Sequence, residues 1–211
     1  MEGSMDLYFS PMSCSMATRI TAYEAGADIR FLRVDTKARP KVLEDGTAFL
    51  TISAKGKVPV LRTDDGELIA ENPVILQYVA DRFPAAGLIP ADGAERRKVQ
   101  SWLSFIGSEL HTGAFTILMK PTAPDGAKAY VRDLLADRLA FVDAHLKGRE
   151  FLQGRFSVAD AYLFVILTWA RHLALDFTAY PNLTAYRDRL QTRPSVAKAF
   201  DEEFTLFKAA A

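Results

Sequence analysis

Residues 56–72 read GKVPVLRTDDGELIAEN and predict the middle of a β-sheet. Two short apolar runs, Val58–Arg62 and Leu68–Ala70, stand on either side of the tripeptide Asp64-Asp65-Gly66. An Asp-Gly pair between two apolar runs is a strong short-range signal for a β-hairpin. We therefore expect two antiparallel strands joined by a tight turn in this stretch.

The segments around the hairpin extend it into a mixed sheet with helices. Alternating apolar residues predict a strand over residues 28–35, and helical spacing predicts a helix that ends at Gly26. The full set is strands at 6–10, 28–35, 58–62 and 68–70, with helices at 13–26, 40–50 (weak) and 71–83. This β-α-β-α-β-β-α order contains a βαβ unit followed by a hairpin and a helix, so helices should form layers on the sheet.

After residue 83 the predicted secondary structure changes from mixed strands and helices to helices only. Residues 84–93 hold two prolines and two glycines without periodicity and are predicted to be a linker. Beyond them we find helical runs only, at 94–119, 125–147, 157–175, 181–192 and 195–208. We expect a mixed α/β domain over 5–83 and an all-helical domain over 94–211. Ser157 and Asp160 should form a capping box that starts a buried helix, which gives Asp160 a structural role.

Composition narrows the classes of function. The 211 residues carry 26 basic and 26 acidic side chains, which leaves no electrostatic footprint for nucleic acid or for an anionic membrane. The single cysteine, Cys14, excludes an intrachain disulfide and fits a reducing compartment, so we expect a cytoplasmic protein. The histidines show no metal-ligand spacing, and one cysteine cannot build a thiolate site, so no metal is expected.

Four local patterns, taken in order, resemble the cytosolic glutathione transferases, and the bacterial beta class in particular. They are Ser10-Pro11-Met12-Ser13-Cys14-Ser15, Gly56-Lys57-Val58-Pro59-Val60-Leu61, Glu71-Asn72 and Ser108-Glu109-Leu110-His111. The likeness runs from about residue 5 to residue 207. It implies a thioredoxin-like N-terminal domain that holds glutathione and an all-helical C-terminal domain that holds a hydrophobic electrophile. It also implies a homodimer with a role in detoxification.

The resemblance leaves alternatives to conjugation. Thiol–disulfide exchange through Cys14 would be a second activity. A glutathione-dependent isomerase or dehalogenase would share the glutathione site and differ in the second pocket. A protein of another class, a binding or regulatory module with the fold but without the chemistry, would lack the thiol-activating groups.

Several side chains compete for contact with the glutathione sulfur. Cys14 follows a strand and opens a helix, where the helix N-terminus favours an anion and lowers a thiol pKa. Its alternative role is that of a small buried hydrophobe. Ser15 could donate to a thiolate, or it could only cap the helix, and Tyr8 is a rival donor that could equally point into the core. His111 is predicted to hydrogen-bond the thiol or act as a base, and its alternative role is that of a hydrogen-bonded structural histidine between the two predicted domains.

Other residues are expected to hold the tripeptide. The resemblance gives Lys57 and a cis Val58–Pro59 bond to the cysteinyl part, while Glu71 takes the glutamyl ammonium and Asn72 the glutamyl carboxylate. The alternative for the last two is a capping pair. Arg39, or else Lys37, could reach the glycyl carboxylate, and the alternative for either is a solvated surface charge. Ser104 and Ser108 share a predicted helix face with His111. Departures from the family pattern are Met12, Ser13, Ser53-Ala54, Asn72 and Thr112, the last of which removes a cation.

Overall fold

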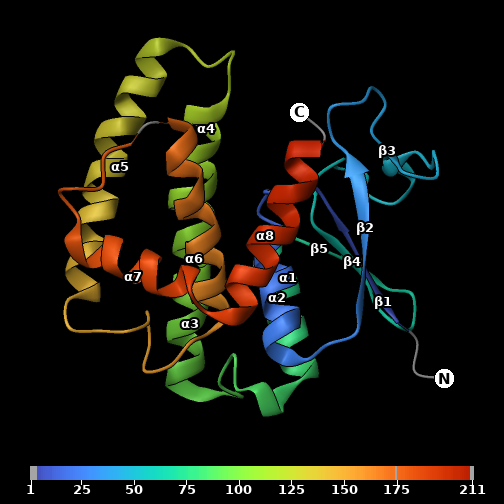
Figure 1. The fold of residues 1–211 in the computed structure, drawn as a ribbon, viewed down its shortest axis with the longest axis horizontal. Helices are drawn as coiled ribbons and strands as arrows, with labels where there is room; N and C mark the ends of the chain where they lie inside the picture. Colours follow the sequence, from blue (N-terminus) through green and yellow to red (C-terminus); the bar gives the residue numbers. More distant parts are fainter. Residues whose placement is uncertain (1–3, 174, 210–211) are drawn as a thin grey trace. The chain divides into compact units, whose positions relative to one another are not determined.

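The computed structural model describes residues 4–173 and 175–209 (Figure 1). These divide into two compact units, one formed by residues 4–88 together with 197–209 and the other by residues 89–196. The predicted all-helical segment 94–211 is therefore shared, because its last helix belongs mainly to the first unit. Each unit is described by itself below.

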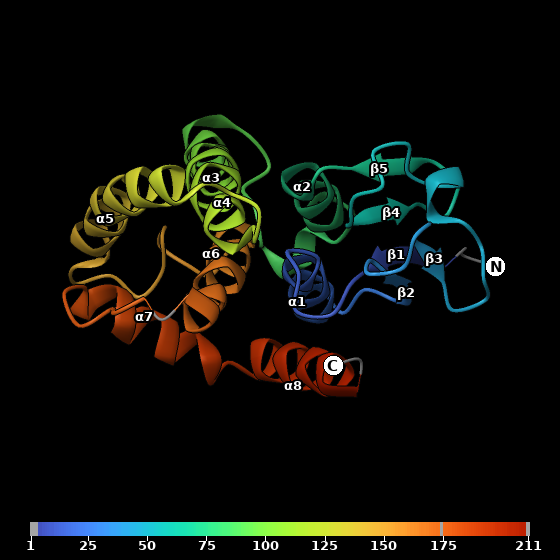
Figure 2. The ribbon, with the colours of Figure 1, turned by 90° about the horizontal axis from the view of Figure 1, so that it is seen from above.

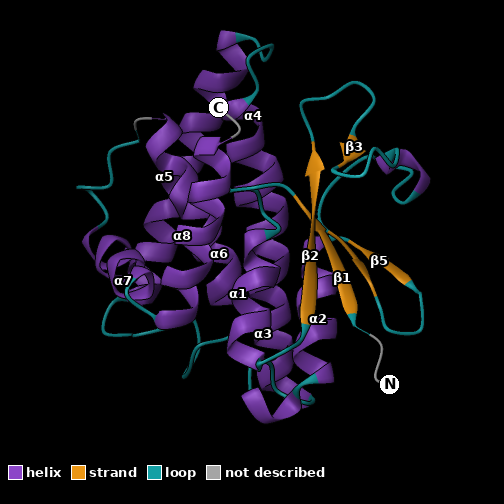
Figure 3. Cartoon of the chain, turned by 45° about the vertical axis from the view of Figure 1, so that its right-hand side comes forward, coloured by secondary structure: helices purple, strands orange, loops and turns teal. Residues whose placement is uncertain are grey.

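The first unit contains a mixed sheet whose strand order is β3-β2-β1-β4-β5 in the described residues. β1 runs parallel to β2 and antiparallel to β4, while β3 and β5 lie antiparallel at the two edges (Figure 3). The strand bounds are β1 Met5–Phe9, β2 Ile29–Asp35, β3 Val42–Leu43, β4 Val60–Arg62 and β5 Leu68–Ala70. The predicted hairpin is confirmed as β4–β5, with Gly66 at φ 93° in its turn.

Three helices belong to this unit, namely α1 (Met16–Ala25), α2 (Asn72–Arg82) and most of α8 (Pro194–Ala209). Gly26 ends α1 in the left-handed conformation, as predicted. Alternation along β1 divides its side chains between two cores. Leu7 and Phe9 pack in the cluster that contains residues of α1 and α2, whereas Tyr8 joins Phe49 in a second cluster.

The predicted helix over residues 40–50 is wrong. The segment instead forms β3 and a short 3-10 turn, Phe49–Thr51. Gly46 adopts φ 84°, and the Asp45 carboxylate accepts the Thr47 N–H at 2.9 Å. These local bonds turn the backbone back on itself, so the i to i+4 ladder of a helix cannot form.

The second unit is helical throughout its regular structure, as predicted. Its α-helices are α3 Gly93–Phe105, α4 Thr116–Met119, α5 Asp125–Leu146, α6 Val158–Thr168 and α7 Pro181–Gln191. A π-helical segment, Ile106–Phe115, joins α3 to α4. α6 is buried along its whole length and contacts α3, the π-helical segment and α7 (Figure 2).

The capping box at the start of α6 is confirmed. The Asp160 carboxylate accepts the Ser157 N–H at 2.9 Å and also the buried hydroxyl of Tyr186 at 2.9 Å. Asp160 thus has the structural role expected from the sequence. In the described part of the chain, no helix is both long enough and apolar enough to span a membrane.

Candidate functional site

A tight turn after β1 presents Cys14 at the start of α1. The Ser13 N–H donates to the Ser10 carbonyl at 3.2 Å, and the Met16 N–H donates to the Ser13 carbonyl at 3.1 Å. Met12 adopts φ 60°, a left-handed conformation that is uncommon for a residue with a side chain. The turn therefore holds an unfavourable backbone geometry next to the cysteine, a feature that clusters at functional sites.

The thiol of Cys14 is a neutral hydrogen-bond donor. The residue is 7% exposed, and its Sγ donates to the Val58 carbonyl at 3.7 Å. Burial raises the pKa of the thiol to about 12, and the charges of Glu203 and Glu71 add to this rise. The expectation of a lowered thiol pKa is therefore wrong, because desolvation outweighs the donors at the helix start.

The two rival sulfur ligands from the sequence have other partners. Ser15 is fully buried, and its hydroxyl lies 3.3 Å from the Ser10 carbonyl and 2.7 Å from the Ser13 hydroxyl. Tyr8 packs against Phe49 in the core, where burial raises its phenol pKa. Both side chains thus serve the local fold in this structure.

A cis peptide bond precedes Pro59, as the resemblance implied. It places Val58 beside Cys14 at the start of β4. The neighbouring loop is tied to this strand start by Lys41, whose Nζ donates to the Gly56 carbonyl at 2.7 Å.

Three cations gather near this loop. Burial lowers the pKa of Lys41, and the positive charges of Lys57 and Arg39 lower it further. Mutual repulsion of this kind is relieved by an anion. Lys41 was missed in the sequence, although it lies two residues after Arg39.

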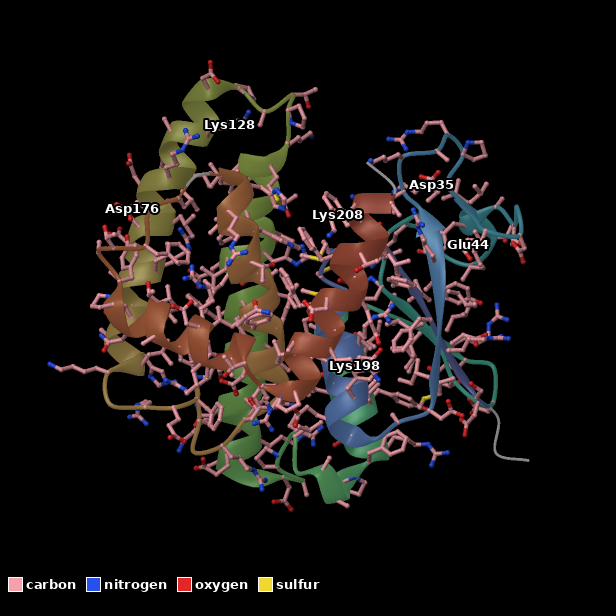
Figure 4. All side chains as sticks on the ribbon, in the orientation of Figure 1. Asp35, Glu44, Lys128, Asp176, Lys198 and Lys208 are labelled. Carbon is pink, nitrogen blue, oxygen red and sulfur yellow. The ribbon has the colours of Figure 1, made fainter. Side chains whose placement is uncertain are left out.

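The Arg39 guanidinium already donates hydrogen bonds to the backbone of its own loop. Its Nη1 donates to the carbonyls of Thr36, Lys37 and Ala38 at 2.8 to 3.1 Å. The loop leaves β2 at Asp35, which is labelled in Figure 4 and accepts two backbone N–H groups of the same turn. A role for Arg39 at the glycyl carboxylate would require these bonds to be exchanged.

Glu71 stands between β5 and α2 in a strained backbone conformation, with φ 71° and ψ 116°. Its side chain makes no capping hydrogen bond, so the capping alternative is not supported. The carboxylate instead pairs with Lys55, with Nζ to Oε1 at 2.6 Å, and the side chain is 62% exposed. A residue with a Cβ held at positive φ and turned outward is typical of a binding position.

Asn72, the next residue, is 4% exposed. Its Oδ1 accepts the Thr18 hydroxyl at 3.3 Å, which links α2 to α1. Its Nδ2 is buried and has no hydrogen-bond partner among the described residues. A buried amide N–H without an acceptor is costly, so this group is a candidate contact for an anion or for water.

The remaining predicted residues belong to the second unit. His111 Nδ1 lies 2.6 Å from the Tyr162 hydroxyl, and its ring packs 5.0 Å from that of Trp169. Tyr162 was missed because nothing near it in the sequence marks a histidine partner. Ser104 lies in α3, whereas Ser108 and His111 lie in the π-helical segment, so the regular α-helical spacing assumed for the three does not hold over this stretch.

Comparisons with known proteins place this arrangement in a family. Residues 11–82 match the model of the glutathione S-transferase N-terminal domain, and residues 108–194 match that of the C-terminal domain. Glutathione S-transferase GstA of Escherichia coli O157:H7 is 38% identical, over 94% of this chain and 98% of the relative. The chain belongs to the glutathione S-transferase family.

Solved structures agree with this membership. This transferase is similar to a sphingomonad glutathione S-transferase complexed with glutathione, at 44% identity and a TM-score of 0.88. A bacterial beta class glutathione S-transferase from Sphingomonas chungbukensis gives the same values. Both comparisons cover 94% of this chain and 98% of the other. The resemblance to the beta class drawn from the four sequence patterns is thereby confirmed.

In the described part of the chain, no group of three or more histidine, cysteine, aspartate or glutamate side chains could hold a metal ion.

Proposed function

We propose that this transferase holds glutathione on its first unit, stabilises the sulfur with the neutral thiol of Cys14, and joins that sulfur to a hydrophobic electrophile. The observation that carries the proposal is the Cys14 S–H, which is buried, protonated at neutral pH and already directed at Val58. A neutral donor can stabilise a glutathione thiolate without adding a second negative charge. The glutathione thiol first gives its proton to a base. The thiolate then forms the new C–S bond as the electrophile loses a leaving group such as halide, or as a polarised double bond opens and later takes up a proton.

Disulfide exchange through Cys14 is less well supported. Exchange requires the attacking sulfur to be a thiolate. With the thiol pKa raised to about 12, the thiolate is scarce at neutral pH. We therefore assign Cys14 a donor role in preference to an exchange role.

The rest of the tripeptide can be assigned to charges that match it. Glu71 suits the glutamyl ammonium, and Asn72 together with the N-terminus of α2 suits the glutamyl carboxylate. The backbone at Val58 and Pro59 suits the cysteinyl part. The cationic cluster of Lys41, Lys57 and Arg39 suits the glycyl carboxylate.

In the second unit we propose His111 as a catalytic residue, with Tyr162 fixing its ring through Nδ1. Tyr162→Phe would remove the hydrogen bond to His111 Nδ1, so the His111 ring would stay in place but lose the contact that fixes its orientation. Ser104 and Ser108 receive a weaker assignment, because the Ser108 hydroxyl donates to the Ser104 carbonyl at 2.9 Å. We further propose a homodimer that works in the cytoplasm, where a lone cysteine stays reduced.

The test compares conjugation of glutathione to an activated aryl halide by the wild-type chain, Cys14→Ala and Cys14→Ser. Serine keeps a neutral donor in nearly the same place, so it should retain much more of kcat than alanine does. Both variants should bind glutathione nearly as well as the wild type. Full activity in Cys14→Ala would show that another group stabilises the sulfur.

A further inference from the structure

The C-terminal helix inserts an acidic side chain into the interior of the first unit. Glu203, on α8, is 0% exposed. Burying a carboxylate is costly unless charges and hydrogen bonds compensate it. Its two oxygens have different partners, Arg19 for Oε1 and Met12 for Oε2.

Arg19 provides the compensating charge. Its Nε donates to Glu203 Oε1 at 3.1 Å, and its Nη1 donates to Glu202 at 3.1 Å. Arg19 is itself 5% exposed, and its guanidinium lies over the rings of Phe9 and Phe31, 4.6 Å and 3.9 Å from their centroids. Arg19 is thus fixed from several sides and can hold Glu203 in one orientation.

The other oxygen reaches the turn that carries the cysteine. The Met12 N–H donates to Glu203 Oε2 at 2.7 Å, across 191 positions of sequence. Met12 is the residue with φ 60° in the turn before Cys14. A charge-assisted bond to its N–H supports a backbone conformation that would otherwise be strained.

The same carboxylate acts on the thiol through its charge. The negative charge of Glu203 raises the pKa of Cys14, in addition to the effect of burial. Burial also raises the pKa of Glu203 itself to about 7, against the lowering effect of Arg19, while neighbouring Glu202 raises it. The charged groups that act on Glu203 are therefore Arg19 from α1 and Glu202 from α8, and the neutral Cys14 thiol is the titratable group that Glu203 affects in turn.

We propose that Glu203 is a positioning residue for the sulfur-binding turn: it holds the Met12 backbone in place and brings an acidic side chain close to the Cys14 thiol. This inference rests on the proposed donor role of Cys14. It assigns to the last helix of the chain a part in thiol chemistry that takes place at the first helix. Lys198 and Lys208, labelled in Figure 4, lie on α8 before and after Glu203.

The test measures how fast iodoacetamide alkylates Cys14, which is the only cysteine and so reports without interference. Glu203→Gln keeps the shape and an acceptor oxygen but removes the charge. Glu202→Gln is the matched control, since Glu202 also pairs with Arg19 but its side chain is 39% exposed, whereas the buried Glu203 accepts the Met12 N–H. Glu203→Gln should alkylate roughly threefold or more faster at pH 8, because its thiolate fraction rises. Glu202→Gln should react like the wild type.

The conjugation assay supplies a second readout. Glu203→Gln should lose about tenfold in kcat, the effect of one weakened charge-assisted bond, with the KM for glutathione nearly unchanged. Equal alkylation rates in the wild type and Glu203→Gln would overturn the proposal, and so would an equal acceleration in Glu202→Gln. Alkylation does not need catalysis, so a failure here is distinct from a failure of the proposed function.

If Glu203→Gln does not fold, the pH dependence of alkylation in the wild-type chain tests the proposal. As the pH rises through about 7, Glu203 gains its charge and pushes the Cys14 pKa upward. The alkylation rate should therefore rise less than tenfold per pH unit in that interval and tenfold per unit above it. An alkylation rate that rises tenfold per pH unit throughout the range from pH 6 to pH 9 would contradict the proposal.

Discussion

Glu71 already has a cationic partner when no ligand is bound, and that partner occupies the place proposed for the glutamyl ammonium. Lys55 Nζ lies 2.6 Å from Glu71 Oε1. Glutathione must displace this ammonium, so Lys55 opposes binding. Lys55→Gln should tighten glutathione binding roughly two- to fivefold, the range for an exposed ion pair. Calorimetric titration at low salt measures this gain, and added salt should abolish most of it.

Glu71→Gln is the opposite change at the same pair. It keeps the size of the side chain but removes the charge that attracts the ammonium. We expect about a tenfold loss of affinity, near the low end for a charge-assisted hydrogen bond because the side chain is exposed. The free energy of unfolding should change by less than about 0.5 kcal/mol, since Glu71 makes no capping bond. Reduced stability with unchanged affinity would contradict this assignment.

At the scale of elements, the π-helical segment depends on one glycine. A Cβ added at Gly113 would lie 2.6 Å from the Ser108 carbonyl oxygen, which is backbone and cannot move aside. Gly113→Ala should therefore destabilise the chain by about 1–3 kcal/mol in urea unfolding. Gly126→Ala in α5 is the matched control, because no atom within 4 Å meets its Cβ, and it should be neutral or slightly stabilising. Equal changes in the free energy of unfolding for the two variants would show that the backbone at Ser108 shifts to make room for the added Cβ.

Elements with strong local signals could be predicted closely from the sequence. β5 and the end of α1 at Gly26 lie where the Asp-Gly hairpin signal and a C-cap glycine indicated. The segment 40–50 was misassigned because its few apolar residues fit helical spacing while turn bonds at Asp45 and Gly46 control the backbone. The π-helical segment could not be foreseen either, since its residues keep a pattern that an α-helix would also show.

The site was predictable where a short motif carries it and not where distant segments meet. Cys14 and the cis Val58–Pro59 bond each belong to a short pattern, and the family resemblance implies that the two patterns share one site. The thiol pKa was misjudged, because burial is a property of the packed chain. Glu203 gave no signal, since its partner Met12 is 191 positions away.

For the whole molecule, the buried Glu203 predicts how stability varies with pH. Its pKa is raised from 4.5 to about 7 in the folded chain, so between these values the folded state holds a proton that the unfolded state has lost. The resulting stabilisation is complete below about pH 4.5 and disappears as the pH rises through about 7. The free energy of unfolding should therefore fall between pH 5 and pH 8, by at most about 3 kcal/mol.

Urea unfolding at several pH values measures how the free energy of unfolding changes with pH. Glu203→Gln has no titrating group at that position, so its free energy of unfolding should be flatter between pH 5 and pH 8. The same slope in both chains would mean that Glu203 is ionised throughout this range in the folded state.

The central claim is that the first unit is built to hold glutathione, and thermal unfolding with and without glutathione tests it most directly. A ligand that binds only the native state at about 100 times its Kd adds roughly 2.7 kcal/mol to stability. For a chain of this size that is a rise in Tm of about 5–10 °C, and the rise should be smaller in Glu71→Gln at the same concentration. The account predicts a Tm that keeps rising with the logarithm of the glutathione concentration once that concentration exceeds Kd. An unchanged Tm at millimolar glutathione would contradict it.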